Sequence, residues 1–405
     1  MNKDELDRLL EVMIKCADGI SDLLFVSGRP PQVEVQGELQ PFVPDQGEPV
    51  LTSERIERLA GAVINNNPRL LSDLKQRGSC DCGYTLKDIC RFRVNIYLQN
   101  GNYAMVLRHL KPLIPSFESL HLAPVFNEII KEKTGLIFVT GGTGMGKTTT
   151  IAAMLNEINQ TRDIHILTLE DPIEFLFTPN KATFSQRELG YDFYSFHDGL
   201  RAAMRQSPKI IFIGEIRDRE TMEIVLNAGE TGHLVLSTLH TTSASLTINR
   251  MLGLFTTDEE RAVRARLAGS MRYILTQRLV PAISGERLLV TELMGSNLRT
   301  REVIAEGENE SRQLDDIIEA GTVSGWHSFE QSLIRAYEQD LITKETALLY
   351  CTNKMRMLQR IDNLYTSASQ KTVKAPPVFT DLKMREQEKT EKAEKVEKLR
   401  DKPGK

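Results

Sequence analysis

The sequence predicts an α/β protein, and three observations support this fold class. Four short apolar segments, GLIFVTG, HILTLE, KIIFIGE and HLVLSTLH, alternate with helical stretches between about residues 125 and 240. Such alternation favours a largely parallel sheet with helices on both faces. A glycine-rich loop follows the first segment and precedes a helical stretch. The 405 residues, 40% of them apolar, suffice for two or three domains with ordinary cores.

The composition is that of an ordinary soluble chain, with 26% charged residues. The net charge of −4 and an isoelectric point near 6.1 do not favour nucleic acid as the principal partner. No run of about eighteen apolar residues is present, so no transmembrane segment is expected. The stretch MNKDELDRLLEVMIKC mixes acids with apolar residues, unlike a secretion signal, and we therefore expect a cytoplasmic protein.

The cysteine content favours reduced thiols. The five cysteines are Cys16, Cys80, Cys82, Cys90 and Cys351. Their odd number and irregular spacing argue against a disulfide framework. The C-x-C pair at residues 80–82 lacks a second matching pair, which disfavours the alternative of a structural zinc site.

Residues 1–110 have the pattern of a small α/β module. The segments DLLFVSG and QVEVQGEL are predicted strands, separated by Gly28 and the Pro30-Pro31 turn. Two helices are expected next, one beginning at Thr52 or Ser53 and the other with Pro68 in its first turn.

A hairpin completes this module. In CRFRVNIYLQNGNYAMVLRHL two alternating strands are joined at Asn100-Gly101, which is a strong hairpin signal. Period-two alternation separates Arg91, Arg93 and Asn95 on one face from Phe92, Val94 and Ile96 on the other. The polar face is either solvated or available to a ligand.

Composition also predicts the divisions of the chain. The segment KPLIPSFESLHLAP has three prolines and no period, so we expect a linker, and residues 243–365 are mostly helical by pattern with a hairpin around RLLVTELMG. The Glu-Lys repeats near the end favour a solvated or partly helical tail. Adaptor binding is the alternative, and interleaved glutamates argue against membrane contact. The predicted divisions are residues 1–111, 112–124, 125–366 and 367–405.

The loop GGTGMGKT, Gly141 to Thr148, matches G-x-x-x-x-G-K-[ST] between a predicted strand and a predicted helix. Its backbone N–H groups would wrap phosphates at the positive end of the helix. Lys147 is expected to bridge the β- and γ-phosphates of ATP, and the Thr148 hydroxyl to bind Mg²⁺. The predicted nucleotide-binding residues are Gly141, Gly142, Thr143, Gly144, Met145, Gly146, Lys147, Thr148 and Thr149.

Acidic residues follow two further predicted strands. The segment LTLEDPIEF places Glu170, Asp171 and Glu174 where an open α/β sheet has its ligand crevice. Asp171 before Pro172 could instead cap a helix. Glu215 follows the next strand, where a glutamate can orient and deprotonate the water that attacks the γ-phosphate.

The stretch IIFIGEIRD lacks the aspartate that usually precedes the acidic residue and handles magnesium, because Gly214 stands there. We therefore expect Mg²⁺ to be held by Thr148 with help, directly or through water, from Glu170. His233 and His240 lie at opposite ends of another predicted strand. For His240 both phosphate contact and a structural role stay open, and His233 is the weaker candidate.

In this order, GGTGMGKTT, EDPIEF, GEIRDRET and ETGHLVLSTLHT resemble the motifs of the secretion-type ATPases, and among them the type IV pilus retraction ATPases. SQRELG, LRAAMRQSP and the early SDLLFVSGRPPQV fit as well, and only the tail after about residue 366 lies outside the likeness. Assembly and type II secretion ATPases usually insert a four-cysteine zinc module, whereas residues 240–350 contain no cysteine here. Gly142 and Met145 replace the family's usual proline and serine, which should preserve phosphate binding and alter only the local fit.

The resemblance implies an N-terminal PAS-like α/β domain, a RecA-like P-loop ATPase domain with a mostly helical C-terminal part, and a homohexameric ring with nucleotide between subunits. It also implies that arginines of the N-terminal domain stabilise charge at a neighbour's γ-phosphate, and Arg217 is expected to form a local or inter-subunit ion pair. The predicted catalytic residues are Glu215, Glu170, His240, Arg91, Arg93 and Arg108.

The implied function is mechanical. ATP hydrolysis around the ring would move the domains, turn an inner-membrane platform protein at the pilus base and retract the pilus, with the chain held peripherally at the membrane. The alternatives are an accessory ring supporting a paralogous retraction ATPase and, less favoured by the acidic charge, a RecA-like nucleic-acid motor. REVIAEGE, residues 301–308, resembles a short motif needed for retraction, or is an ordinary helix ending at Gly307.

Overall fold

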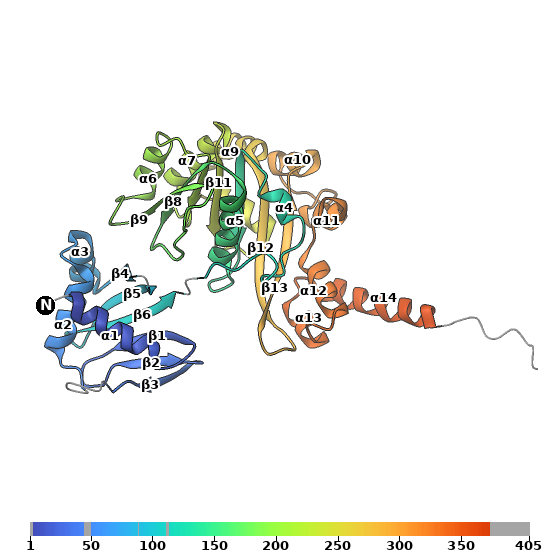
Figure 1. Cartoon of the computed structure of the whole chain (residues 1–405). Coiled ribbons are helices and arrows are strands. Elements are labelled where there is room, and N and C mark those ends of the chain that lie inside the picture. Colours follow the sequence, from blue (N-terminus) through green and yellow to red (C-terminus); the bar gives the residue numbers. More distant parts are fainter. Residues whose placement is uncertain (1–2, 44–49, 88, 111–112, 373–405) are drawn as a thin grey trace, which may run out of the picture.

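The computed structural model describes residues 3–43, 50–87, 89–110 and 113–372 (Figure 1). Within these residues the chain forms a six-stranded sheet near the N-terminus and a seven-stranded sheet in the part that follows. No helix among the described residues is long and apolar enough to cross a membrane. Apart from residues 367–372 at the end of the last helix, the predicted tail lies outside the described residues.

The first sheet is antiparallel, with the strand order β3-β2-β1-β6-β5-β4. Its strands are β1 (Ile20–Phe25), β2 (Gln32–Val35), β3 (Glu38–Pro41), β4 (Ser79–Leu86), β5 (Cys90–Gln99) and β6 (Asn102–Leu110). The helices that pack on one of its faces are α1 (Lys3–Lys15), α2 (Ser53–Ile64) and α3 (Pro68–Arg77).

Two tight turns organise this sheet. β5 turns into β6 at Asn100-Gly101, as predicted, and both residues have the positive φ (50° and 76°) of a two-residue hairpin turn. The prediction of one strand over QVEVQGEL is wrong. Gln36 and Gly37 adopt φ values of 53° and 85°, so the segment folds back on itself as β2 and β3. Helix α1 and strand β4 were not predicted.

The alternation predicted for β5 is confirmed. Phe92, Val94 and Ile96 are fully buried in the core formed with the helices. Arg93 is exposed and Arg91 is partly exposed on the opposite face of the strand. The helices therefore leave the arginine-bearing face of the sheet uncovered.

The second sheet has the order β13-β12-β7-β11-β10-β8-β9, and all neighbours except β12 and β13 are parallel. Its strands are β7 (Gly135–Thr140), β8 (His165–Glu170), β9 (Thr183–Glu188), β10 (Ile210–Ile213), β11 (Leu234–Leu239), β12 (Met271–Pro281) and β13 (Arg287–Gly295). The predicted largely parallel sheet is confirmed, and the carboxyl ends of β7, β8, β10 and β11 share one edge.

Helices cover both faces of this sheet, as expected. Ile137 and Val139 of β7 pack in one core with α5, whereas Leu136 and Phe138 pack in another with α7. The helices up to β13 are α4 (Phe126–Ile129), α5 (Lys147–Thr161), α6 (Phe196–Ala203), α7 (Arg219–Glu230), α8 (Ala244–Leu252) and α9 (Thr257–Ser270). Those after β13 are α10 (Leu298–Glu306), α11 (Leu314–Ala320), α12 (Phe329–Glu338), α13 (Lys344–Tyr350) and α14 (Lys354–Thr372).

The C-terminal part is mostly helical with one hairpin, as predicted. The hairpin around RLLVTELMG is confirmed as β12 and β13, but β12 also extends the parallel sheet beside β7. From β12, Arg278 Nη1 donates to the carbonyl oxygen of Tyr350 at 2.5 Å, and its guanidinium lies 3.7 Å from the centroid of the Phe329 ring. The last helices, at the far end from the first sheet in Figure 1, are thus attached directly to a strand of the central sheet.

Candidate functional site

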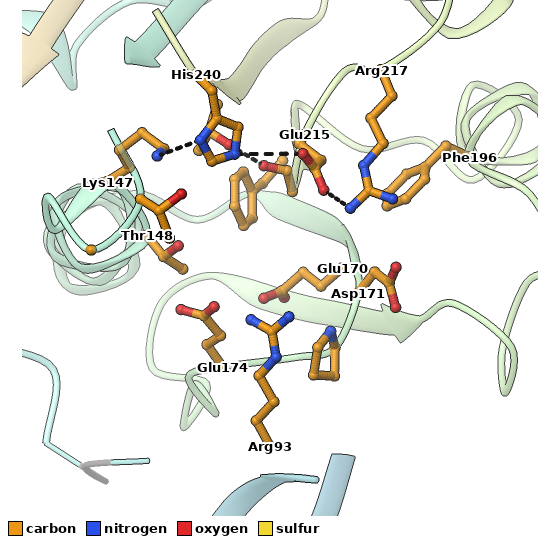
Figure 2. Close-up of a pocket in the computed structure, with 16 residues that line it drawn as sticks. Arg93, Lys147, Thr148, Glu170, Asp171, Glu174, Phe196, Glu215, Arg217 and His240 are labelled. Carbon is orange, nitrogen blue, oxygen red and sulfur yellow. Dashed lines mark hydrogen bonds and ion pairs between the residues drawn. The ribbon is translucent and has the colours of Figure 1, made fainter. Parts of the chain in front are cut away.

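The glycine-rich loop connects β7 to α5 at the carboxyl edge of the second sheet (Figure 2). Gly144 and Gly146 have φ values of 75° and 79°, which glycine adopts without strain. Lys147 begins α5, and its Nζ donates to the carbonyl oxygens of Gly141 and Gly142, both at 2.9 Å. Among the described residues no side chain caps the N-terminus of α5, so its N–H groups are available to an anion.

Strand β12 anchors the loop from behind. The N–H of Leu279 donates to Met145 Sδ at 3.3 Å, and Gln277 Nε2 donates to the Thr150 hydroxyl at 2.7 Å. A Cβ at Gly141 would lie 2.6 Å from the carbonyl oxygen of Gln277, so only glycine fits there. The local effect expected of Met145 is therefore a contact with β12.

A cavity of about 310 Å³ opens in front of the loop. It is lined by Arg93, Lys147, Thr148, Glu170, Glu215 and His240, all predicted site residues. Thr143 and Gly144 also line it, whereas Gly141, Gly142, Met145, Gly146 and Thr149 belong to the loop and α5 without lining it.

Glu170 ends β8 and is 4% exposed. Its carboxylate accepts hydrogen bonds from the Thr168 hydroxyl at 2.7 Å and from Gln186 Nε2 at 3.4 Å. Burial raises the pKa of Glu170 to about 7, although both hydrogen bonds oppose the rise. A carboxylate in a cavity with a pKa shifted this way is a candidate functional group.

The strand ends that carry Glu170 and Gly214 are neighbours. β8 and β10 pair with Leu169 opposite Ile213, which places Glu170 opposite Gly214. A Cβ at Gly214 would lie 3.6 Å from Glu170 Cα, an ordinary contact. Glu170 is therefore the neighbour of Gly214, the position at which other P-loop proteins usually carry the aspartate.

Asp171 and Glu174 also line the cavity. Residues 171–182 contain no helix, so the structure contradicts the alternative in which Asp171 caps one. Burial lowers the pKa of Lys147, and the carboxylates of Glu215 and Glu174 oppose this shift. The acids thus help to keep the loop lysine charged.

A row of polar side chains crosses the cavity in Figure 2. His240 Nδ1 lies 3.4 Å from Lys147 Nζ, and His240 Nε2 lies 3.7 Å from Glu215 Oε2. The other Glu215 oxygen is paired with Arg217, as a local ion pair. Burial and the Lys147 charge lower the pKa of His240, which favours its neutral form.

The structure separates the three predicted arginines of the N-terminal sheet. Arg93 lines the cavity, and its side chain forms no hydrogen bond or ion pair with the described residues. Figure 2 shows its guanidinium pointing between Glu174 and Glu170. Arg91 contacts other groups beside the cavity, and Arg108 pairs with Asp22 at 3.1 Å within its own sheet. Neither lines the cavity of this chain.

Sequence reasoning missed several contributors. Phe196, Phe212 and Thr238 also line the cavity, and Gln186 supports Glu170 from the unpredicted strand β9. The motif SQRELG was the available signal for this strand. His233 stands before β11, at the opposite end from His240, and does not line the cavity.

A strand that leads through this glycine-rich loop into a helix, with acids at neighbouring strand ends, defines a P-loop nucleoside-triphosphate-binding protein. Residues 89–381 match the family model of the Type II/IV secretion system protein. The chain therefore belongs to that family.

Proteins that resemble most of this chain include pilus ATPases. The Type IV pilus retractation ATPase PilT of Pseudomonas aeruginosa is 36% identical over 329 residues, which cover 81% of this chain and 93% of that protein. The Type IV pilus ATPase PilU of the same organism is 33% identical over 360 residues, or 88% and 92% of the two chains. The crystal structure of the pilus retraction motor PilT with bound ADP superposes with a TM-score of 0.78 at 38% identity, covering 87% of this chain and 98% of that one.

Proposed function

We propose that this chain is an ATP hydrolase that acts as the motor of type IV pilus retraction and twitching motility. The observation that carries the proposal is the convergence of Lys147, Thr148, Glu170 and Glu215 on one cavity, in a chain that resembles retraction ATPases over most of its length. These residues match the protein groups that phosphoryl transfer to water commonly uses.

Each of these residues has one task in the proposed reaction. The loop N–H groups and Lys147 hold the phosphates of ATP. Glu215 accepts a proton from the attacking water, and neutral His240 orients its carboxylate. Arg93 enters from the N-terminal sheet and neutralises the charge that develops on the γ-phosphate.

The donor set suits Mg²⁺. Thr148 and Glu170 present a hydroxyl and a carboxylate to the same cavity, and Mg²⁺ prefers oxygen donors combined with substrate phosphates. Bound with ATP, the ion would neutralise negative charge on the phosphates. Glu170 can take this task at the strand end beside Gly214 because its carboxylate faces the cavity.

ATP hydrolysis should require a higher Mg²⁺ concentration at acidic pH than at alkaline pH. Burial raises the pKa of Glu170 to about 7, so its carboxylate is protonated below that pH and ionised above it. The Mg²⁺ concentration for half-maximal ATP hydrolysis should therefore be roughly tenfold higher at about pH 6 than at about pH 8. Titration of phosphate release with MgCl₂ at the two pH values measures this ratio.

The matched control is Glu170→Gln, which keeps the shape of the side chain and cannot titrate. Its remaining pH dependence reports the protonation of ATP itself. If the Mg²⁺ requirement depends on pH equally in the wild type and in this variant, the assignment of Glu170 to the magnesium site is wrong.

The larger assembly is proposed from resemblance. The six-stranded sheet within residues 1–111 corresponds to a PAS-like domain, residues 112–124 to the linker, and residues 125–366 to the RecA-like domain with its helical end. Six copies form a ring, in the cytoplasm at the inner membrane, that turns a platform protein at the pilus base. A paralogous retraction ATPase is a further proposed partner, because both PilT and PilU of one organism resemble most of the chain.

Two experiments test the function. Purified protein with ATP and Mg²⁺ should release phosphate, and no strong stimulation by single-stranded DNA is expected. A strain lacking the gene should extend pili without retracting them. If that strain still retracts its pili, the protein is an accessory to another motor.

A further inference from the structure

A separate group of contacts joins the two sheets beside the cavity. Arg91 of β5 forms an ion pair with Glu188 at the end of β9, and only 14% and 6% of these side chains are exposed. Arg91 Nε also donates to the carbonyl oxygen of Ile173 at 2.8 Å. The Glu188 carboxylate accepts the N–H groups of Ile173 at 3.0 Å and of Gly83, in β4, at 3.1 Å. Groups from both sheets therefore meet at one carboxylate.

We propose that Arg91 and Glu188 form an interdomain latch that positions Arg93 at the phosphates, and that Arg91 itself does not bind nucleotide. The inference rests on the proposed function, because the position of Arg93 matters only if the cavity holds ATP. It gives Arg91 a role different from the one that the resemblance implied, and it adds Glu188 as a positioning residue.

The guanidinium of Arg91 is engaged away from the cavity. Its three nitrogen atoms each have a partner, since Nη1 donates to the Thr85 hydroxyl at 2.7 Å, Nε to Ile173 and Nη2 to Glu188. The planar, rigid fork of an arginine is fixed by three such contacts. Arg93 lies two residues further on the same face of β5, so the fixed strand presents it to the cavity.

Ile173 connects the latch to the acidic loop of the site. It stands between Asp171 and Glu174, which line the cavity, and the latch holds both its N–H and its carbonyl oxygen. A closed latch therefore fixes the acidic loop and Arg93 relative to each other. Opening it would remove these contacts and loosen the position of one relative to the other, although Asn67 and Arg69 would still donate to the carbonyl oxygens of Gly190 and Leu189.

A substitution at Gly83 should open the latch without removing either charged side chain. A Cβ at this position would lie 2.2 Å from Arg91 Nη2 and 3.0 Å from Glu188 Oε1. The closest obstacle is the flexible end of a side chain, so alanine should displace the guanidinium and leave β4 folded. Gly61→Ala in α2 is the matched control, because a Cβ there meets no atom within 4 Å.

The test compares the full-length wild type with Gly83→Ala, Arg91→Lys and Gly61→Ala. We expect Gly83→Ala and Arg91→Lys to lower kcat about 10- to 100-fold at nearly unchanged KM, because the defect lies in positioning. In nucleotide-free protein, hydrogen exchange of the 171–176 segment should accelerate about tenfold. Gly61→Ala should match the wild type in both measurements.

A combined variant separates positioning from a merely structural role. Because the latch acts through Arg93, Gly83→Ala with Arg93→Ala should lower kcat no further than Arg93→Ala alone. Additive losses would overturn the proposal. So would a raised KM with unchanged hydrogen exchange in Arg91→Lys, or wild-type turnover and exchange in Gly83→Ala. If wild-type protein releases no phosphate from ATP, the proposed function fails, while hydrogen exchange still tests the latch.

Discussion

Replacing Glu215 with glutamine should lower the turnover number for ATP about 10²- to 10⁴-fold, the usual contribution of a general base. Glutamine has nearly the same size and can still accept hydrogen bonds, but it cannot take a proton from water. The loop and Lys147 are untouched, so the dissociation constant for ATP should change little. Phosphate release and titration with a fluorescent ATP analogue measure the two quantities separately.

The matched control for this substitution is Glu223→Gln. Glu223 lies in α7, is largely exposed and does not line the cavity. It should keep wild-type turnover. Normal turnover in Glu215→Gln would assign the proton acceptor elsewhere, with His240 as the next group to test because its neutral imidazole lies 3.7 Å from Glu215.

Removal of the Arg93 side chain should have an equally large effect. An arginine that neutralises γ-phosphate charge in the transition state contributes on the order of 10³-fold or more to turnover. Arg93→Ala should therefore lower kcat by about this factor, with a smaller change in KM, because the charge it neutralises develops during the reaction. Steady-state phosphate release over a range of ATP concentrations measures both constants.

Arg108 provides a control from the same hairpin. It pairs directly across from Arg93 between β5 and β6, yet its ion pair is with Asp22. Arg108→Ala should keep turnover within about twofold and cost on the order of 1 kcal/mol of stability, as partly exposed ion pairs do. Equal losses of kcat in the two variants would contradict the assignment and would support a role for Arg108 at a neighbouring subunit.

Local sequence patterns were sufficient to predict the phosphate loop, the parallel strands and the two faces of β5. These features depend on spacing within a few residues, such as the glycines before Lys147 or the alternation around Phe92. The positions of Glu170 and Glu215 at strand ends also follow from local pattern, because parallel strands share one carboxyl edge.

Most of the errors concern partners distant in sequence. QVEVQGEL is the exception, because its error is local: the adjacent residues Gln36 and Gly37 adopt positive φ values and divide the segment, and the glycine was an available turn signal. Strand β9 is short and polar, and its pairing with β8 stabilises it. Arg91, Arg93 and Arg108 are alike in sequence, and their different roles depend on contacts with Glu188, the cavity and Asp22. No local pattern specifies such contacts.

Strand β12 joins the phosphate loop to the C-terminal helices. It contacts the phosphate loop through Met145 and the C-terminal helices through Arg278. The strand is hydrogen-bonded to β7 on one side and to β13 on the other, which restrains it between these two groups. We therefore expect a displacement of the phosphate loop to reach α12 to α14, which lie away from the loop in Figure 1, through this strand.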